Sequence, residues 1–270
     1  MKRFLRLWKH ARKTACSSTR PTLSNQMEAI NVDTPPSLQA VIFDCDGILV
    51  DTEPLHYKAF QAVLKPFGLV YDYDHYLKHY IGFDDRDAFR ESFREGGRPL
   101  DGVTLERLIE AKDHELRKVI ASGISTFPGV ISLVRELQSQ EVPLAVASGA
   151  LHREVEDFIE ALGLRDAFPI IIAADDVERS KPDPETYIKA FEALKARPGL
   201  DRIEPRRCAA IEDTPAGIQA AASAGLMVVA VTNSFPAPQL NKADRVVASL
   251  EEVSRSGLDE WIRQRKDTEA

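Results

Sequence analysis

The fold is decided by one stretch of the chain, Ala40-Val-Ile-Phe-Asp44-Cys-Asp46-Gly47-Ile-Leu-Val-Asp51-Thr-Glu-Pro54. Four apolar residues lead into two aspartates that are separated by one residue and followed by glycine. A continuous apolar run of this kind is typical of a strand buried on both faces, as in a parallel sheet. Ligands of open α/β sheets bind beyond the carboxyl ends of such strands, so we expect Asp44 and Asp46 to face one cleft. Two carboxylates repel by about 4 kcal/mol at about 4 Å and an effective dielectric constant near 20, so the stretch predicts a cation beside them.

The composition indicates a soluble globular protein that binds a small molecule. The 270 residues carry a net charge of −7, which argues against a nucleic-acid partner. No apolar run approaches the roughly 18 residues of a membrane span, so no membrane partner is expected. The cysteines are odd in number, scattered and without a CxxC pair, at Cys16, Cys45 and Cys208. This pattern excludes a disulfide framework and a cysteine zinc site, and it favours a reducing, cytoplasmic location.

Residues 1–37 are predicted to form a disordered basic tail and linker. The first 26 residues carry seven lysines and arginines and no acidic residue. They lack the apolar segment of a secretory signal. An organelle transit peptide remains open, as do a simple disordered tail and an upstream start codon with Met27 as the working start.

Strands and helices alternate through the second half of the chain. Strands are predicted at 142–147, 169–173, 208–211 and 227–231, and helices at 130–137, 152–162, 185–195 and 215–224. The segment 55–127 has no strand-like run; it has helices at 55–67 and 105–120 and a loop at 80–86. This order predicts a parallel, doubly wound, Rossmann-like α/β core formed by residues 38–54 and 128–270, with residues 55–127 inserted as a helical domain.

Polar side chains follow four of the predicted strands, and parallel strands bring such ends to one edge of the sheet. They are Asp44 with Asp46, Ser148, the Lys181 segment, and Glu212 with Asp213. Four carboxylates and one lysine would repel a dianionic substrate unless a divalent cation joined them. Oxygen ligands without a histidine or thiol cluster favour Mg²⁺. Such a set suits phosphoryl transfer through an aspartyl-phosphate, with a second carboxylate protonating the leaving oxygen.

The same residues also allow simpler interpretations. A calcium-binding EF-hand needs glycine and glutamate where this chain has Leu49 and Leu55. Strand alternation turns Cys45 away from the two aspartates, which favours a buried apolar role over a thiol nucleophile. Glu212 and Asp213 could form a solvated turn, but they directly end a predicted buried strand.

The four strand-end groups, Asp44 with Asp46, Ser148, the Lys181 segment, and Glu212 with Asp213, resemble the four sequence motifs of the haloacid dehalogenase-like hydrolases. The similarity is to the branch that holds β-phosphoglucomutase and phosphoglycolate phosphatase. The resemblance covers roughly residues 39–250. It implies Asp44 as the nucleophile and Asp46 as the acid/base, with Ser148 and Lys181 binding phosphate. The dehalogenases themselves lack the second aspartate, so a phosphate ester is the expected substrate. The resemblance also makes the inserted helical domain a mobile cap that closes over the substrate.

The same resemblance implies the metal ligands. Mg²⁺ would bind Asp44, the main-chain carbonyl of Asp46, and Asp213, with Glu212 beside or on the metal.

Four residues outside these sets are candidates for substrate binding. His56 could contact substrate or pack at the hinge of the inserted domain. Lys112 lies on the apolar stripe of its helix, so it could be a snorkelling stem, whereas the resemblance places a cap lysine facing the active site near here. Arg86 is the one cation of its loop, and Gly149 follows the motif serine.

The mutases of this branch carry groups for a second phosphate that this chain lacks. It has Asp84-Asp85-Arg86-Asp87-Ala88 in the cap loop and Ala150-Leu151-His152 after Gly149. We therefore expect a Mg²⁺-dependent phosphatase acting on a small phosphorylated metabolite, either a sugar phosphate or a phosphoglycolate-like acid. A hexose-phosphate mutase and a non-enzymatic metabolite-binding or regulatory protein are the alternatives. Monomer and weak dimer both remain open.

Overall fold

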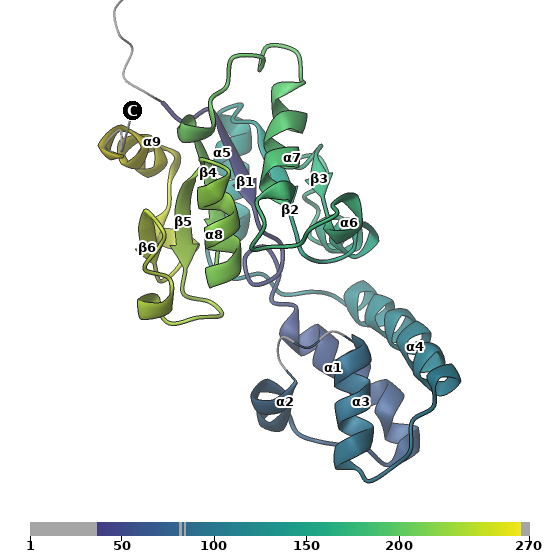
Figure 1. Ribbon diagram of the computed structural model, residues 1–270. Helices are drawn as coiled ribbons and strands as arrows, with labels where there is room; N and C mark the ends of the chain where they lie inside the picture. The colour runs from purple at the N-terminus through teal and green to yellow at the C-terminus, as the bar shows by residue number, and fades with distance from the viewer. Residues whose placement is uncertain (1–36, 81–82, 84, 266–270) are drawn as a thin grey trace, which may run out of the picture. The chain divides into compact units, whose positions relative to one another are not determined.

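A computed structural model describes residues 37–80, 83 and 85–265, and within them six parallel strands form one sheet (Figure 1). The strands are β1 (Ala40–Phe43), β2 (Leu144–Ala147), β3 (Ile171–Ile172), β4 (Cys208–Glu212), β5 (Met227–Val231) and β6 (Arg245–Val247). Their order is β3-β2-β1-β4-β5-β6, so the chain leaves β1 first toward one edge and later toward the other. The carboxyl end of β1 is therefore the topological switch point, where α/β proteins bind ligands. The predicted doubly wound sheet is confirmed.

Helices cover both faces of the sheet (Figure 1). One face packs against α5, α6 and α9, and the other against α7 and α8. Their bounds are α5 Val130–Ser139, α6 His152–Ala161, α7 Glu185–Lys195, α8 Pro215–Ser223 and α9 Arg255–Gln264. Successive β1 side chains enter opposite apolar clusters because strand side chains alternate. β1 is thus buried on both sides.

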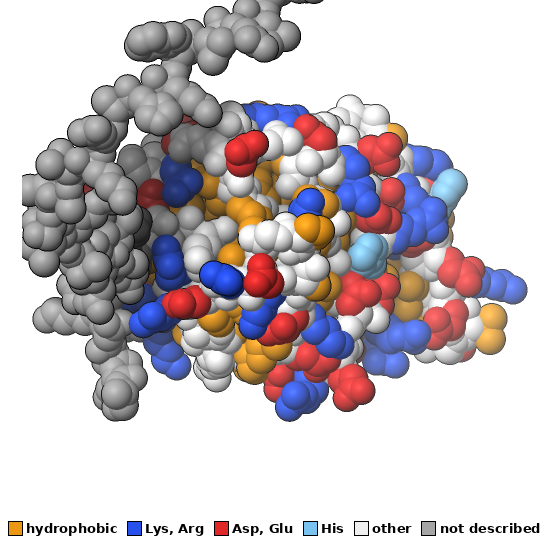
Figure 2. All heavy atoms as spheres, turned by 90° about the horizontal axis from the view of Figure 1, so that it is seen from above, with side chains coloured by type: hydrophobic (Ala, Val, Ile, Leu, Met, Phe, Trp, Pro, Cys, Tyr) orange, Lys and Arg blue, Asp and Glu red, His pale blue; other side chains and the backbone are white. Residues whose placement is uncertain are grey.

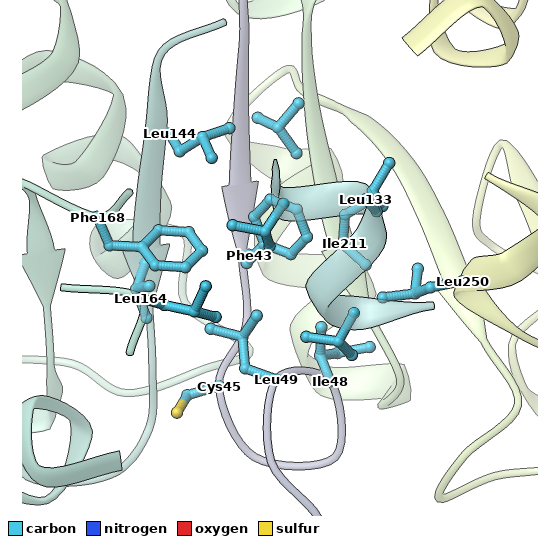
Figure 3. Packing of buried hydrophobic residues seen from close by; sticks show 14 of the residues in the cluster. Phe43, Cys45, Ile48, Leu49, Leu133, Leu144, Leu164, Phe168, Ile211 and Leu250 are labelled. Atoms are coloured by element: carbon cyan, nitrogen blue, oxygen red, sulfur yellow. The ribbon is translucent and has the colours of Figure 1, made fainter. Parts of the chain in front are cut away.

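Aromatic and branched side chains fill the layer beside β1 (Figure 3). Phe43 meets Phe168 edge to face, with ring centroids 5.6 Å apart. Cys45 is fully buried in the same cluster, close to Leu49 in sequence and in space (Figure 3). Burial raises the pKa of the Cys45 thiol well above its ordinary value. These observations agree with the predicted apolar role of Cys45 and disfavour a thiolate.

Between β1 and α5 the described residues form four α-helices: α1 (Glu53–Leu64), α2 (Tyr73–His79), α3 (Asp85–Glu95) and α4 (Gly102–Ala121). They enclose an apolar cluster of their own, built largely from aromatic side chains. Aspartates cap two of them, because the Asp72 and Asp101 carboxylates accept hydrogen bonds from main-chain amides in the first turns of α2 and α4. The division at residues 54/55 and 127/128 stays a prediction.

Several local predictions were wrong. Asp85 and Arg86 were placed in a loop, but they form the first turn of α3. The acidic start of this helix stabilises it, and its polar composition hid the buried stripe that ends at Phe93. The strand predicted at 169–173 is limited to two residues. β6 and α9 were not predicted. The predicted tail 1–37 lies outside the described residues except for Ser37.

On the face shown in Figure 2, acidic and basic side chains are interspersed with small hydrophobic patches. In the described part of the chain, every helix is too short or too polar to cross a bilayer.

Candidate active site

Asp44 follows β1 directly and is buried at the switch point of the sheet. Its amide donates to the Ile211 carbonyl of β4, so the hydrogen bonding between β1 and β4 continues one residue beyond the end of β1. The chain then turns tightly through Gly47, whose φ of 77° favours glycine. A β-carbon at this position would also overlap the Asp213 carboxylate. Gly47 therefore lets the loop after β1 approach the Asp213 carboxylate closely.

The Lys181 ammonium lies between two of the carboxylates. Its Nζ donates to Asp44 Oδ1 at 2.8 Å, to Glu212 Oε1 at 2.7 Å and to the Ala147 carbonyl at 3.0 Å. Burial alone would lower the pKa of Lys181, but Asp44 and Glu212 reverse this effect and raise it well above its ordinary value. Lys181 is therefore a fixed positive charge joining β1, β2 and β4.

Both oxygens of Glu212 are already engaged in hydrogen bonds. Oε1 accepts from Lys181 and from the Tyr187 hydroxyl at 3.0 Å. Oε2 accepts from the Asp213 amide at 2.9 Å and from the Thr214 amide and hydroxyl at 3.0 and 3.1 Å. Burial acts to raise the pKa of Glu212, but Lys181 and these donors outweigh it and lower the pKa. Glu212 is thus better suited to hold Lys181 than to bind an ion directly.

Asp213 has the opposite environment. Ser234 donates its hydroxyl to Oδ2, whereas the buried Oδ1 has no hydrogen-bond partner. Burial raises the pKa of Asp213 to about 7, with Ser234 opposing the shift and Glu212 adding to it. A buried acceptor without a donor is costly and calls for a ligand. Oδ1 is such an acceptor.

Oxygen atoms of Asp44, Glu212 and Asp213 lie within 4.8 Å of one another. Burial also raises the pKa of Asp44 well above its ordinary value, with Lys181 opposing the shift. One ammonium does not fully compensate three carboxylates. The oxygen-only donor set and the unpartnered Asp213 atom fit a small, hard divalent cation.

Asp46 points into the adjacent cavity. Ser148 Oγ donates to Asp46 Oδ2 at 3.3 Å and accepts from the Ala150 amide at 3.0 Å. Burial raises the pKa of Asp46, although Thr52, Lys181 and Ser148 oppose the shift. A raised pKa suits a carboxyl group that must carry a proton for part of a catalytic cycle.

The cavity has a volume of about 380 Å³, within the range of small-molecule sites. Its lining comes from the loops after β1 and β2, from the helical segment between β1 and α5, and from the first turn of α6: Asp46, Thr52, Glu53, His56, Phe60, Tyr76, Phe83, Asp85, Gly149, Ala150 and Glu154. The structure therefore places the sequence candidates His56 and Gly149 at one cavity with Asp46.

Lys112 lies behind this lining, with only 2% of its surface exposed. Its Nζ meets His56 Nδ1 at 2.9 Å, donates to Asp85 Oδ1 at 2.7 Å and lies 5.1 Å from the centre of the Phe60 ring. Burial, with the Lys112 ammonium beside it, lowers the pKa of His56 to about 3, so the imidazole is neutral. In this structure Lys112 supports lining residues and does not line the cavity itself.

Arg86 is half exposed and forms a two-point ion pair with Glu106, with N–O distances of 2.5 and 3.1 Å. Its side chain is not among the described residues that line the cavity.

Sequence reasoning missed several residues of the site. Ser234 follows β5, so the strand-end argument could have found it if it had been extended to that strand. Tyr187 lies inside α7, where a buried aromatic residue gives no separate signal. Glu53 and Glu154 lie in the first turns of α1 and α6, where acidic residues are common for helix stability alone.

Gly217→Ala is expected to disturb the site from a distance. A β-carbon at Gly217 would overlap the Glu212 carboxylate, which is hydrogen-bonded on all sides and cannot move freely. We expect a loss of about 1–3 kcal/mol in the free energy of unfolding, together with reduced activity. Gly102→Ala is the matched control, because a β-carbon there meets nothing within 4 Å. Equal stability of the two variants in urea unfolding would contradict this role for Gly217.

Comparison with known proteins adds a family and several relatives. Residues 41–231 match the family model described as "Haloacid dehalogenase-like hydrolase". The chain is 31% identical over 216 residues to validoxylamine A 7′-phosphate phosphatase of Streptomyces hygroscopicus subsp. limoneus, covering 80% of this chain and 95% of the relative. It is 30% identical over 189 residues to a phosphorylated carbohydrates phosphatase of Thermotoga maritima, covering 70% of this chain and 82% of the relative.

A solved structure shares the fold. It is a mutant of CbbY from Rhodobacter sphaeroides in complex with xylulose-(1,5)bisphosphate, with a TM-score of 0.69 and 27% identity. The match covers 82% of this chain and 99% of that one. The family match over residues 41–231 includes the strand ends of the site and the helices α1 to α4.

Proposed function

The chain belongs to the haloacid dehalogenase-like hydrolases, and on that premise we propose that it is a Mg²⁺-dependent phosphatase of a small phosphorylated metabolite. The substrate would be a sugar phosphate or a phosphoglycolate-like acid, hydrolysed through an aspartyl-phosphate. The observation that carries the proposal is the meeting of Asp44, Lys181 and Asp213 beside a cavity that holds Asp46. The names of the two curated relatives, both phosphatases, support it.

We place the metal on Asp44, Asp213 and the main-chain carbonyl of Asp46. Glu212 would lie beside the metal, because its oxygens already accept from Lys181, Tyr187 and main-chain amides. Bound there, Mg²⁺ would supply positive charge to the phosphoryl oxygens and to the two crowded carboxylates.

In the first proposed step, an Asp44 carboxylate oxygen attacks phosphorus. A phosphorus–oxygen bond to Asp44 forms and the ester bond breaks, while Asp46 gives its proton to the leaving alkoxide. Lys181 would neutralise charge on the phosphoryl group, and the Ser148 hydroxyl would donate to one of its oxygens. Both side chains are buried or nearly so, where such charge is most effective.

In the second step, Asp46 takes a proton from water as that water attacks phosphorus. The bond to Asp44 breaks, which releases phosphate and returns both aspartates to their starting states. The helical segment 55–127 is proposed as the cap that excludes other water during the first step. The cavity disfavours the mutase alternative, because the described residues that line it include no lysine or arginine for a second phosphate.

The proposal is tested with p-nitrophenyl phosphate. We expect turnover that requires added Mg²⁺ and stops with a chelator. Absence of turnover with Mg²⁺, or turnover that persists with excess chelator, would overturn the proposed function.

Binding of Mg²⁺ is expected to stabilise the fold through Asp213. At a concentration a hundredfold above the dissociation constant, the gain is about 2.7 kcal/mol, which raises Tm by roughly 5–10 °C. Asp213→Asn removes the charge next to the unpartnered oxygen, so most of the increase should be lost. Asp201→Asn, on an exposed residue, is the control and should keep the full shift. The same shift in all three proteins would contradict the assignment.

A further inference from the structure

The cavity beside Asp46 is acidic beyond the reacting groups. Three carboxyl groups line it from three different helices: Glu53 from α1, Asp85 from α3 and Glu154 from α6. Among the described lining residues there is no lysine or arginine. Among the residues that the structure describes there, a ligand that reaches past Asp46 therefore meets several carboxylates and no exposed cation.

The nearest cation behind the lining is already neutralised. Lys112 Nζ donates to Asp85 Oδ1 and faces His56 Nδ1, and it is almost fully buried. His56 itself is neutral, since its pKa is lowered to about 3. Neither residue offers the cavity an unpaired positive charge.

Two of the carboxyl groups keep one oxygen for a ligand. Glu53 Oε2 accepts from the Tyr76 hydroxyl at 2.8 Å, and Glu154 Oε2 accepts from the Leu151 amide at 3.3 Å. Within the described part of the chain, the Oε1 atoms of Glu53 and Glu154 have no hydrogen-bond partner. Hydroxyl groups donate to such acceptors, whereas a phosphate or carboxylate would be repelled by them.

Apolar surface on the same wall suits a carbon skeleton. Phe60, Phe83 and Ala150 line the cavity between the carboxyl groups. The volume of about 380 Å³ leaves room for a body of sugar size.

We propose that this cavity selects monophosphates whose remaining part is uncharged and rich in hydroxyl groups, and rejects substrates with a second anionic group. The inference rests on the proposed phosphatase function and narrows it: sugar and polyol monophosphates are accepted, and phosphoglycolate-like acids and bisphosphates are not. Glu53 and Glu154 are the specificity-determining residues.

The test uses compounds that differ by one charge. Glycerol 3-phosphate is compared with 3-phosphoglycerate, and 2-hydroxyethyl phosphate with 2-phosphoglycolate. Each is measured as a substrate and as a competitor of p-nitrophenyl phosphate in the presence of Mg²⁺. We expect the uncharged member of each pair to be favoured by about tenfold or more, the effect of one close like-charge contact. An anionic member that is bound or hydrolysed equally well would overturn the inference, and so would failure of both uncharged members to compete.

Isosteric variants locate the effect. Glu53→Gln and Glu154→Gln are each expected to reduce the preference for the uncharged member of each pair by about threefold or more, because each removes one negative charge from the cavity wall. Glu160→Gln, an exposed residue on the same helix as Glu154, is the charge-matched control and should leave the preference unchanged. An unchanged preference in both cavity variants would overturn the assignment of these residues. Absence of p-nitrophenyl phosphate hydrolysis in the wild type would instead overturn the proposed function, so the two failures are distinguishable.

Discussion

Asp44→Asn is expected to lower kcat by about 10⁴-fold or more, since removal of an attacking group costs that much in enzymes with covalent intermediates. The amide that replaces the carboxylate keeps nearly the same shape and can still accept from Lys181 at Oδ1. It cannot attack phosphorus, and it carries no charge for a metal. Steady-state hydrolysis of p-nitrophenyl phosphate with saturating Mg²⁺ measures the effect.

The control for this variant is Asp201→Asn, because the Asp201 side chain is 78% exposed. It should retain wild-type activity. The Asp44 variant should remain folded, which circular dichroism and its melting curve would show. A folded Asp44→Asn protein that kept a tenth or more of the wild-type kcat would remove Asp44 from the role of nucleophile.

Lys181→Met is expected to cost about 3–5 kcal/mol in the free energy of unfolding, because removing one partner leaves buried charge uncompensated. Methionine can fill the space of the lysine stem, so the effect isolates the ammonium. Asp44 and Glu212 would then face each other without it, and the Glu212 side chain is fully buried. Urea unfolding without Mg²⁺ measures the difference. Activity should also be lost, since the phosphoryl group loses its protein cation.

Lys189→Met provides the comparison. Lys189 also pairs with a glutamate, Glu185, but its side chain is 43% exposed, and exposed ion pairs contribute only about 0–1 kcal/mol. If Lys181→Met and Lys189→Met lowered the free energy of unfolding by similar amounts, Lys181 would not hold the two carboxylates together.

The sequence was most informative about the ends of the parallel strands. Asp44, Ser148 and Asp213 each directly follow a strand of the sheet, and parallel topology brings such ends to one edge. The structure brings them together with Lys181, which is 137 positions from Asp44 in the chain. Strand order and direction, and not fine packing, determine this convergence, so it could be predicted from the sequence. The catalytic roles of these residues stay predictions.

The helical segment was less predictable. α2 was missed because it is short and buries only Tyr76, and α3 because it is predominantly charged, with Phe89 and Phe93 as its only large apolar side chains. Arg86 was expected near the active site from its loop position, but helix α3 includes it and Glu106 pairs with it. Lys112 was found on an apolar stripe, yet only tertiary structure shows that His56 and Asp85 surround its ammonium. Cavity walls of this kind depend on side chains from several helices, which no single stretch encodes.

The central claim is that Asp44 forms a covalent bond to phosphorus in the presence of Mg²⁺. The most direct measurement is to quench the enzyme in acid during turnover, reduce the trapped acyl phosphate with borohydride and map the modified residue by mass spectrometry. The account predicts homoserine at position 44, dependent on both substrate and Mg²⁺, with position 46 unchanged. Modification at any other residue, or turnover with no trapped residue at position 44, would contradict it.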